Sequence, residues 1–226
     1  MVALAKAREV LSSVGWLSRQ PPEFRSEVLR RSSLRRFGAG DVIYRVGDPL
    51  GGVYGIVTGA AVVTMAPGAT IPRLFHVGMP GSWIGEGSFL TREPRRVGMQ
   101  AAIETWTMYL PLEAMDQIAS RDPLATRRFI KILMTNVDIL NRAFYELQNP
   151  DENRRVAAAL LRVAPLDGTP IPVSQADLGI MSNTSRKQVN AALQRFAAAG
   201  LLAKGYRTIT VLDDRLLRRF LEAADC

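Results

Sequence analysis

The main change in the period of the hydrophobic pattern of this chain lies close to Pro111. Before that residue, short runs rich in β-branched and aromatic side chains alternate with turns, and thirteen of the 18 glycines lie between Gly38 and Gly98. After it, apolar residues recur at the spacing of an α-helix. This change predicts an α+β fold, with an antiparallel β-sandwich, roll or barrel followed by helices.

The expected elements follow from these runs. Strands are expected at 42–46, 53–58, 60–65, 70–77, 99–103 and 105–110. Short helices are expected near Leu4–Val14 and Pro22–Ser32 ahead of the strands, and at Leu112–Ser120 after them. Pro22 suits the start of a helix, where its missing N–H costs nothing.

A long helix is expected next, with Asp122 as its N-cap, Pro123 as its first residue and an end near Gln148. Its apolar residues have the 3-4-3-4-3 spacing of a heptad repeat, with Ile and Val at two a positions and Leu at every d position. They are Ile130, Leu133, Val137, Leu140, Phe144 and Leu147. This choice favours the seam of a parallel two-stranded coiled coil. The alternative is a helix buried in the core of its own chain.

Asn149-Pro150-Asp151 breaks that helix, because proline lacks a donor and restricts the residue before it. We therefore expect a hinge between domains here, followed by a helix at 152–163.

Residues 173–213 have the pattern of two helices joined by a turn and followed by a hairpin. Ser174 can cap a helix at 175–181, Asn183 tolerates the left-handed turn, and Ser185 with Gln188 forms a capping box for a second helix that stops at Gly200. The hairpin has Lys204, Gly205 and Tyr206 at its tip.

This segment matches the chemistry of duplex DNA. An exposed helix fits the major groove, where Arg186 can bind guanine, and Asn190 or Gln194 can pair with adenine. The helix N-terminus and the basic hairpin suit phosphates. The expected DNA-binding residues are Ser185, Arg186, Lys187, Asn190, Gln194, Lys204 and Arg207. The alternative is a helical subdomain with a solvated polar face.

The chain resembles the CRP/FNR superfamily of bacterial transcription regulators over nearly its whole length. The resemblance rests on FGAGDVIYRVGD (37–48), VYGIVTG (53–59) and SRKQVNAAL (185–193). It implies a cyclic-nucleotide-binding-like β-roll with N-terminal helices at 1–121, a dimerisation helix at 122–149, and a winged helix-turn-helix at 150–226. It also implies a homodimer on an inverted-repeat operator and contact with RNA polymerase. Lys187 stands where cyclic-AMP receptors have glutamate, so the DNA site should differ from theirs.

The segment WIGEGSFLTREPRRVGMQ (83–100) resembles the phosphate-binding cassette of this family. The resemblance implies an effector site that takes a cyclic nucleotide or another small molecule. Its expected residues are Gly85, Glu86, Arg96, Val97, Leu140 and Asn141. Glu86 matches the acid on the ribose and Arg96 the arginine on the phosphate. Val97 and Leu140 replace hydroxyl residues, so cyclic AMP, another ligand and no required ligand all remain open. Glu86 and Arg96 can also be a structural ion pair.

Composition narrows the classes of function. The net charge of +8 favours a polyanionic partner, and no apolar run is long enough to span a membrane. One cysteine, Cys226, and one histidine, His76, exclude an iron–sulfur or multi-histidine zinc site within one chain. His76 is interpreted as a strand residue and not as a haem ligand. We expect a cytoplasmic regulator that is not an enzyme and has no certain cofactor. The alternative is a sensor module that regulates a protein partner without DNA.

Overall fold

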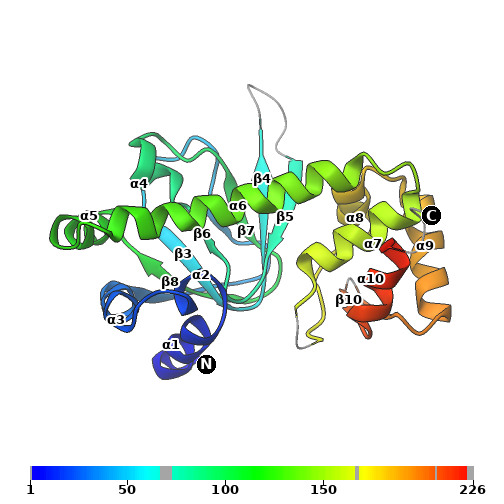
Figure 1. Ribbon diagram of the computed structural model, residues 1–226, viewed down its shortest axis with the longest axis horizontal. Coiled ribbons are helices and arrows are strands. Elements are labelled where there is room, and N and C mark those ends of the chain that lie inside the picture. The colour runs from blue at the N-terminus through cyan, green and yellow to red at the C-terminus, as the bar shows by residue number, and fades with distance from the viewer. Residues whose placement is uncertain (1, 67–72, 166–167, 207, 223–226) are drawn as a thin grey trace. The chain divides into compact units, whose positions relative to one another are not determined.

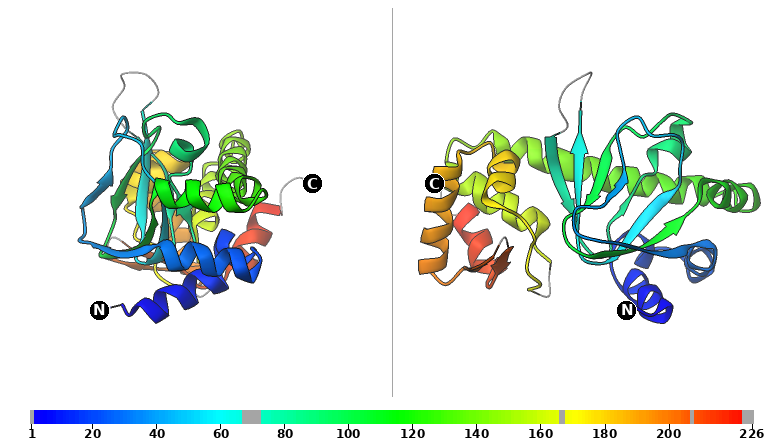
Figure 2. Two further views of the ribbon diagram at one scale, coloured as in Figure 1. Left: turned by 90° about the vertical axis from the view of Figure 1, so that its left-hand side faces the viewer. Right: turned by 180° about the vertical axis from the view of Figure 1, so that it is seen from behind.

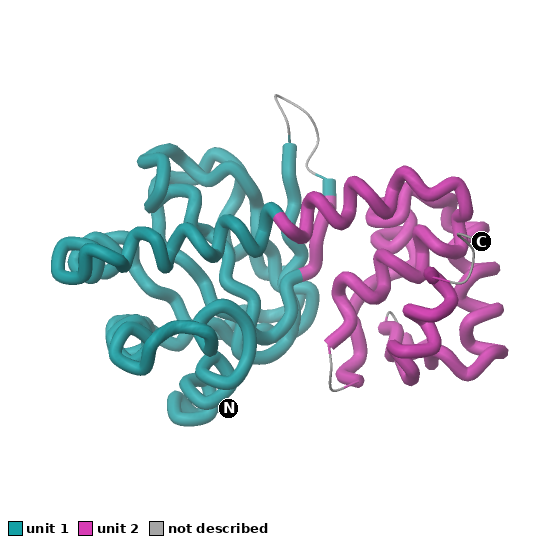
Figure 3. Tube along the Cα trace, in the orientation of Figure 1, with its two compact units in different colours: residues 1–73, 78–137 teal, residues 74–77, 138–226 magenta. Residues whose placement is uncertain are grey.

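The computed structural model describes residues 2–66, 73–165, 168–206 and 208–222 (Figure 1). The chain divides into two compact units inside its longest helix (Figure 3). Residues 1–73 and 78–137 form the first unit, and residues 74–77 and 138–226 form the second. The predicted domain boundaries at 121/122 and 149/150 stay a prediction, because compactness does not test which segments fold alone. Among the described residues, no helix has the length and hydropathy needed to cross a membrane.

The N-terminal half of the chain is built on two four-stranded sheets, and the strand pairs of described register are antiparallel. The strand orders are β1-β8-β3-β6 and β2-β7-β4-β5. The strands are β1 (Ser33–Phe37), β2 (Val42–Tyr44), β3 (Val53–Thr58), β4 (Ala61–Met65), β5 (Arg73–Gly78), β6 (Trp83–Ile84), β7 (Gly98–Ala101) and β8 (Thr105–Leu110). With the helices below, they confirm the predicted α+β fold class.

Strand β3 is buried on both of its faces, so its side chains show which layer lies on each side of the first sheet. Val53 and Val57 belong to a hydrophobic core shared with the helices. Ile56 points the other way, toward the second sheet, where Gly78 of β5 leaves room for its side chain. The two faces of β3 therefore place the first sheet between the second sheet and the helices. Figure 2 shows the chain from two further sides. His76 is buried in β5, and burial lowers its pKa to about 4.

An aromatic cluster joins the helices to the first sheet. Trp16 contacts the rings of Phe24, Trp83 and Phe129, and its indole N–H donates to the carbonyl oxygen of Arg128 at 2.8 Å. These side chains come from distant parts of the chain, so the cluster fixes the helices onto the β-roll. The helices of this layer are α1 (Leu4–Ser13), α2 (Gly15–Ser18), α3 (Pro22–Arg31), α4 (Gly87–Thr91), α5 (Leu112–Arg121) and the start of α6 (Ala125–Leu147).

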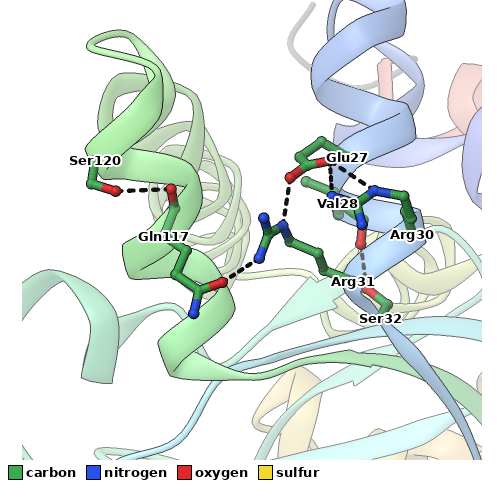
Figure 4. Close-up of polar contacts among 7 residues, drawn as sticks. All are labelled: Glu27, Val28, Arg30, Arg31, Ser32, Gln117 and Ser120. Carbon is green, nitrogen blue, oxygen red and sulfur yellow. Dashed lines mark hydrogen bonds and ion pairs between the residues drawn. The ribbon is translucent and has the colours of Figure 1, made fainter.

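A polar contact holds α3 against α5 at the edge of this layer (Figure 4). Glu27 accepts hydrogen bonds from both Arg30 and Arg31, and these two guanidinium groups lower its pKa. The Arg31 guanidinium also donates to the side-chain oxygen of Gln117 on α5. Arg31 thus links two helices through a contact that spans 86 residues of the sequence.

The second unit contains the remaining helices and a two-stranded hairpin. The elements are α7 (Glu152–Val163), α8 (Gln175–Ser182), α9 (Arg186–Ala198), β9 (Leu202–Gly205), β10 (Thr208–Val211) and α10 (Asp214–Glu222). The predicted helix at 152–163 and the predicted hairpin are confirmed. Phe196 of α9 packs edge-on against Phe220 of α10, which closes this unit with its own core.

Some predicted boundaries were wrong, and several elements were not predicted. Helix α6 begins at Ala125, two residues later than predicted. The contact expected of the predicted cap is present, because the Asp122 carboxylate accepts from the N–H of Leu124 at 2.9 Å. The unpredicted elements are α2, α4, α10, β1 and β6. Strand β1 is short and rich in arginine, so only its pairing with β8 marks it as a strand.

Candidate functional site

The second helix of the helix-turn-helix presents an exposed polar face. The predicted capping box is present: the Ser185 hydroxyl accepts from the backbone N–H of Gln188, and the Gln188 side chain accepts from the N–H of Ser185. Val189, Leu193 and Phe196 bury the opposite face. The capping box starts α9 at a defined residue, so its first turn projects outward.

The predicted DNA-binding residues of α9 do not all lie in the same environment. Arg186, Lys187 and Gln194 are exposed to solvent. Asn190 is half-buried, and its side-chain oxygen accepts from Nε2 of Gln175 at 3.3 Å. Three of these side chains are therefore free to meet a ligand, whereas Asn190 is already oriented by a residue of α8.

The hairpin that follows α9 shares a groove with it. The groove has a volume of about 450 Å³ and brings together the first turn of α8, the start of α9 and the hairpin. Its polar lining includes Ser174, Gln175, Arg186, Lys204 and Tyr206. Tyr206, at the predicted hairpin tip, is 92% exposed. The structure thus brings Arg186 and Lys204 to one surface, while Arg207 lies outside the described residues.

The turn between α8 and α9 has the backbone expected for it. Asn183 adopts a left-handed conformation with φ 47°, as its side chain permits. At the start of α8, Ser174 and Asp177 form a second capping box, of which only the Ser174 cap was predicted. The Asp177 carboxylate therefore accepts from the N–H of Ser174, at 3.1 Å, at the N-terminus of α8.

The β-roll contains a buried carboxylate, Glu86, and a buried guanidinium group, Arg95, close to Gly85. Glu86 accepts from the N–H of Gly85 at 3.1 Å and from the side chain of Asn136 at 3.0 Å. Gly85 has φ +112°, and a Cβ there would lie 2.6 Å from Nη1 of Arg95. Glycine is therefore required at this position for both conformation and space.

The buried arginine is Arg95 and not its neighbour Arg96. Arg95 donates to the carbonyl oxygens of Gly85 and Gly52 at 2.8 Å and 2.7 Å, and its guanidinium lies over the ring of Tyr44. Arg96 is exposed and forms an ion pair with Glu93. The structure therefore does not bring Arg96 to Glu86. Burial raises the pKa of Tyr44, whose hydroxyl is buried without a partner among the described residues.

The other predicted effector residues are not among the described hydrogen-bond partners of Glu86. Val97 is half-buried at the edge of the cassette. Leu140 and Asn141 are exposed on α6, in the part of the helix that belongs to the second unit. Asn136 contacts Glu86 where the resemblance suggested residues one turn later.

The predicted dimer seam forms an uncovered stripe on α6. Ala125, Phe129 and Ile132 bury one face of the helix against the β-roll core. On the seam, Ile130 and Leu140 are each 38% exposed and Phe144 is 70% exposed. Leu133 and Leu147 are also exposed, and Val137 is half-buried. The alternative, a helix buried in its own core, does not fit these exposures.

Four side chains that shape these sites were not predicted from the sequence. They are Arg95, Asn136, Gln175 and Arg155, whose Nε donates to the carbonyl oxygen of Ser182 at the end of α8. Each acts through a partner at least ten residues away in the chain. Only Arg95 carried a signal, because it lies beside Arg96 in the segment that resembles the phosphate-binding cassette.

The chain matches two family models. Residues 34–122 match the cyclic nucleotide-binding domain, and residues 154–220 match the Crp-like helix-turn-helix domain. The first match covers the β-roll, and the second covers the segment from α7 to α10.

Curated relatives match along most of the chain. One is a CRP-like cAMP-activated global transcriptional regulator of Mycobacterium tuberculosis, 22% identical over 220 residues, or 93% of this chain and 98% of the relative. Another is the transcriptional regulator LdrP of Thermus thermophilus, 27% identical over 194 residues, or 82% and 95%.

Solved structures share the fold. FixK2 from Bradyrhizobium japonicum superposes with a TM-score of 0.70 at 20% identity, over 83% of this chain and 96% of FixK2. A CRP/FNR-family regulator from Thermus thermophilus gives a TM-score of 0.62 at 22% identity, over 84% and 98%. The predicted resemblance to the CRP/FNR superfamily of DNA-binding transcription regulators is confirmed.

Proposed function

We propose that this regulator binds an inverted-repeat operator as a homodimer, with α6 of each copy at the seam and α9 in the major groove. The observation that carries the proposal is the shared groove, in which Arg186 of α9 lies with Lys204 of the hairpin. Arg186 suits a base edge because its planar fork can donate two bonds to guanine. Lys204 suits a phosphate because it is exposed on the hairpin beside the reading helix.

The uncovered stripe on α6 supports the dimer. Six apolar side chains at heptad spacing, mostly exposed, leave an apolar surface that a second copy would cover. A two-fold dimer places two reading helices on half-sites about one helical turn, ~34 Å, apart. This spacing is the general one for dimeric helix-turn-helix proteins, regulators of the CRP type among them, and follows from the pitch of B-form DNA.

We further propose that the β-roll receives a small effector beside Glu86 and Arg95. An anionic group entering there would meet a permanently charged guanidinium, but it would compete with the two carbonyl oxygens that Arg95 already binds. The cAMP activation named for the Mycobacterium tuberculosis relative does not decide the ligand of this chain. In this proposal the protein acts in the cytoplasm, contacts RNA polymerase and catalyses no reaction.

The test is selection of binding sites from a random duplex pool, with the purified full chain. The wild type should select an inverted repeat. Arg186→Ala should lose about 1–3 kcal/mol of binding free energy and relax the preference at one base of each half-site. Lys204→Ala should weaken binding to all DNA sequences to a similar extent and reduce the salt dependence of the affinity.

Arg36→Ala is the matched control, because Arg36 is an exposed arginine of β1 in the other unit. It removes the same charge and should leave the selected site unchanged. If Arg186→Ala selects the same site as the wild type, Arg186 is not a base reader. If the wild type binds no duplex, the alternative of a sensor module without DNA gains support.

A further inference from the structure

Helix α7 carries an arginine that binds two separate segments of the chain. Nη1 of Arg155 donates to the carbonyl oxygens of Asn149 and Pro150, at 2.8 Å and 3.1 Å. Nε donates to the carbonyl oxygen of Ser182 at 3.0 Å, and Nη2 to that of Asn183 at 3.3 Å. One guanidinium therefore joins the chain just after α6 to the turn between α8 and α9.

A second arginine makes the same connection one heptad later. Nη1 of Arg162 pairs with the carboxylate of Glu146 in the last turn of α6, and Nη2 donates to the carbonyl oxygen of Met181 at 3.2 Å. The side chain of Arg162 is only 3% exposed, so this pair is shielded from solvent and from salt. Both arginines place positive charge near helix C-termini, where it is favourable.

The turn that these arginines hold determines where α9 points. Only Asn183, Thr184 and Ser185 separate the end of α8 from the start of α9. The side chain of Gln188 on α9 also donates to the carboxylate of Glu152 on α7. Side-chain contacts thus connect the end of α6, α7 and the start of α9 across the predicted hinge.

We propose that Arg155, supported by Arg162, is a positioning residue that sets the half-site spacing the dimer accepts. The inference rests on the proposed function, a homodimer joined through α6. If the seam and the reading helix are rigidly connected, the distance between the two reading helices has one preferred value. Each base pair added to an operator moves a half-site by about 3.4 Å and rotates it by about 35°. A rigid dimer should therefore discriminate sharply between spacers.

The experiment compares the full-length wild type with Arg155→Met, Arg155→Lys and Arg218→Met. Methionine keeps an apolar side chain but removes every donor. Lysine keeps the charge, but its single ammonium group cannot donate to both segments, residues 149–150 and 182–183. Arg218 is an exposed arginine of α10 that pairs only with Asp214 among the described contacts, so it is the matched control. The probes are duplexes with the selected half-sites at the optimal spacing and at two base pairs more or fewer, and a duplex with one half-site.

We expect the wild type and Arg218→Met to bind the optimal spacer at least about tenfold more tightly than either altered spacer, a difference of about 1.4 kcal/mol. In both Arg155 variants this ratio should fall to about threefold or less, while affinity for the single half-site changes by less than about threefold. A change in spacing preference without a change in half-site affinity is the signature of positioning, which general destabilisation would not produce.

Three outcomes would overturn the inference. The first is an Arg155 variant that folds and retains the discrimination of the wild type. The second is a loss of half-site affinity as large as the loss on the full operator, which would make Arg155 merely structural. The third is a relaxed spacing preference in Arg218→Met as well. Failure of the wild type to bind any inverted repeat is a different result, because it refutes the proposed function on which the inference rests. Thermal unfolding identifies a variant that fails to fold, and Arg155→Lys then carries the test.

Discussion

Two adjacent arginines of the β-roll have opposite environments, and this difference controls what each can do. Arg95 is buried and donates to the carbonyl oxygens of two glycines, Gly52 and Gly85. Arg96 is exposed and pairs with Glu93 three residues away. Removing Arg95 would leave buried carbonyl groups without a donor, which is costly, whereas solvent replaces the partner of an exposed ion pair.

We therefore predict that Arg95→Ala lowers the free energy of unfolding of the β-roll by about 3 kcal/mol, and that Arg96→Ala changes it by less than about 1 kcal/mol. Urea unfolding followed by tryptophan fluorescence measures this, because Trp16, Trp83 and Trp106 all lie in the first unit. Equal losses in the two variants would show that the buried contacts of Arg95 contribute no more than a surface pair.

At the scale of elements, the two faces of α6 have different roles. Its first turns bury Phe129 and Ile132 in the core of the β-roll, and its heptad stripe stays open to solvent. The heptad pattern was visible in the sequence, but the burial of the opposite face was not. An apolar stripe on a helix that is already anchored on its other side has no further partner within the described chain, which favours a second copy.

Leu140→Glu should convert the dimer into monomers. It would bury an unpaired carboxylate from each copy at the seam, at a cost on the order of 3–5 kcal/mol. Light scattering across a dilution series measures the change in mass. Thr135→Glu, which adds the same charge at an exposed position off the stripe, should remain dimeric. A dimer that survives Leu140→Glu at every dilution would place the seam elsewhere.

For the whole molecule, the question is how the β-roll influences DNA binding. A ligand can shift operator affinity only if it binds the DNA-competent state more tightly, and the coupling must be reciprocal. The donors of Arg95 toward Gly52 and Gly85 are already used, and Val97 has no hydroxyl. These features reduce the number of hydrogen bonds that a cyclic phosphate could gain beside Glu86 and Arg95.

We expect millimolar cyclic AMP or cyclic GMP to change operator affinity by less than about threefold, which is a coupling below about 0.7 kcal/mol. Fluorescence anisotropy with labelled operator measures this in the wild type and in Arg96→Ala, and the two should behave alike. A large gain with cyclic AMP that disappears in Arg96→Ala would show that the exposed arginine turns to bind the phosphate.

Features that depend on neighbours close in the chain could be predicted from the amino acids alone. The capping box at Ser185 and Gln188, the left-handed Asn183 and the hairpin at 202–211 are set by contacts between residues close in the chain. The heptad stripe is likewise a local pattern, because each residue meets those three and four positions away. For these features, the amino acids present at fixed spacing are sufficient for a prediction.

Which of two similar residues enters a site depends on contacts between residues far apart in the chain. The choice of Arg95 over Arg96 depends on Gly52, which lies 43 residues earlier, and the contact of Arg155 with Asn183 spans 28 residues. The approach of Asn136 to Glu86 spans 50 residues. Such pairings form after elements have packed, and packing depends on the shapes of all the side chains in the core. Local spacing therefore cannot specify them, and the contacts that tie the reading helix to α6 became visible only in the folded chain.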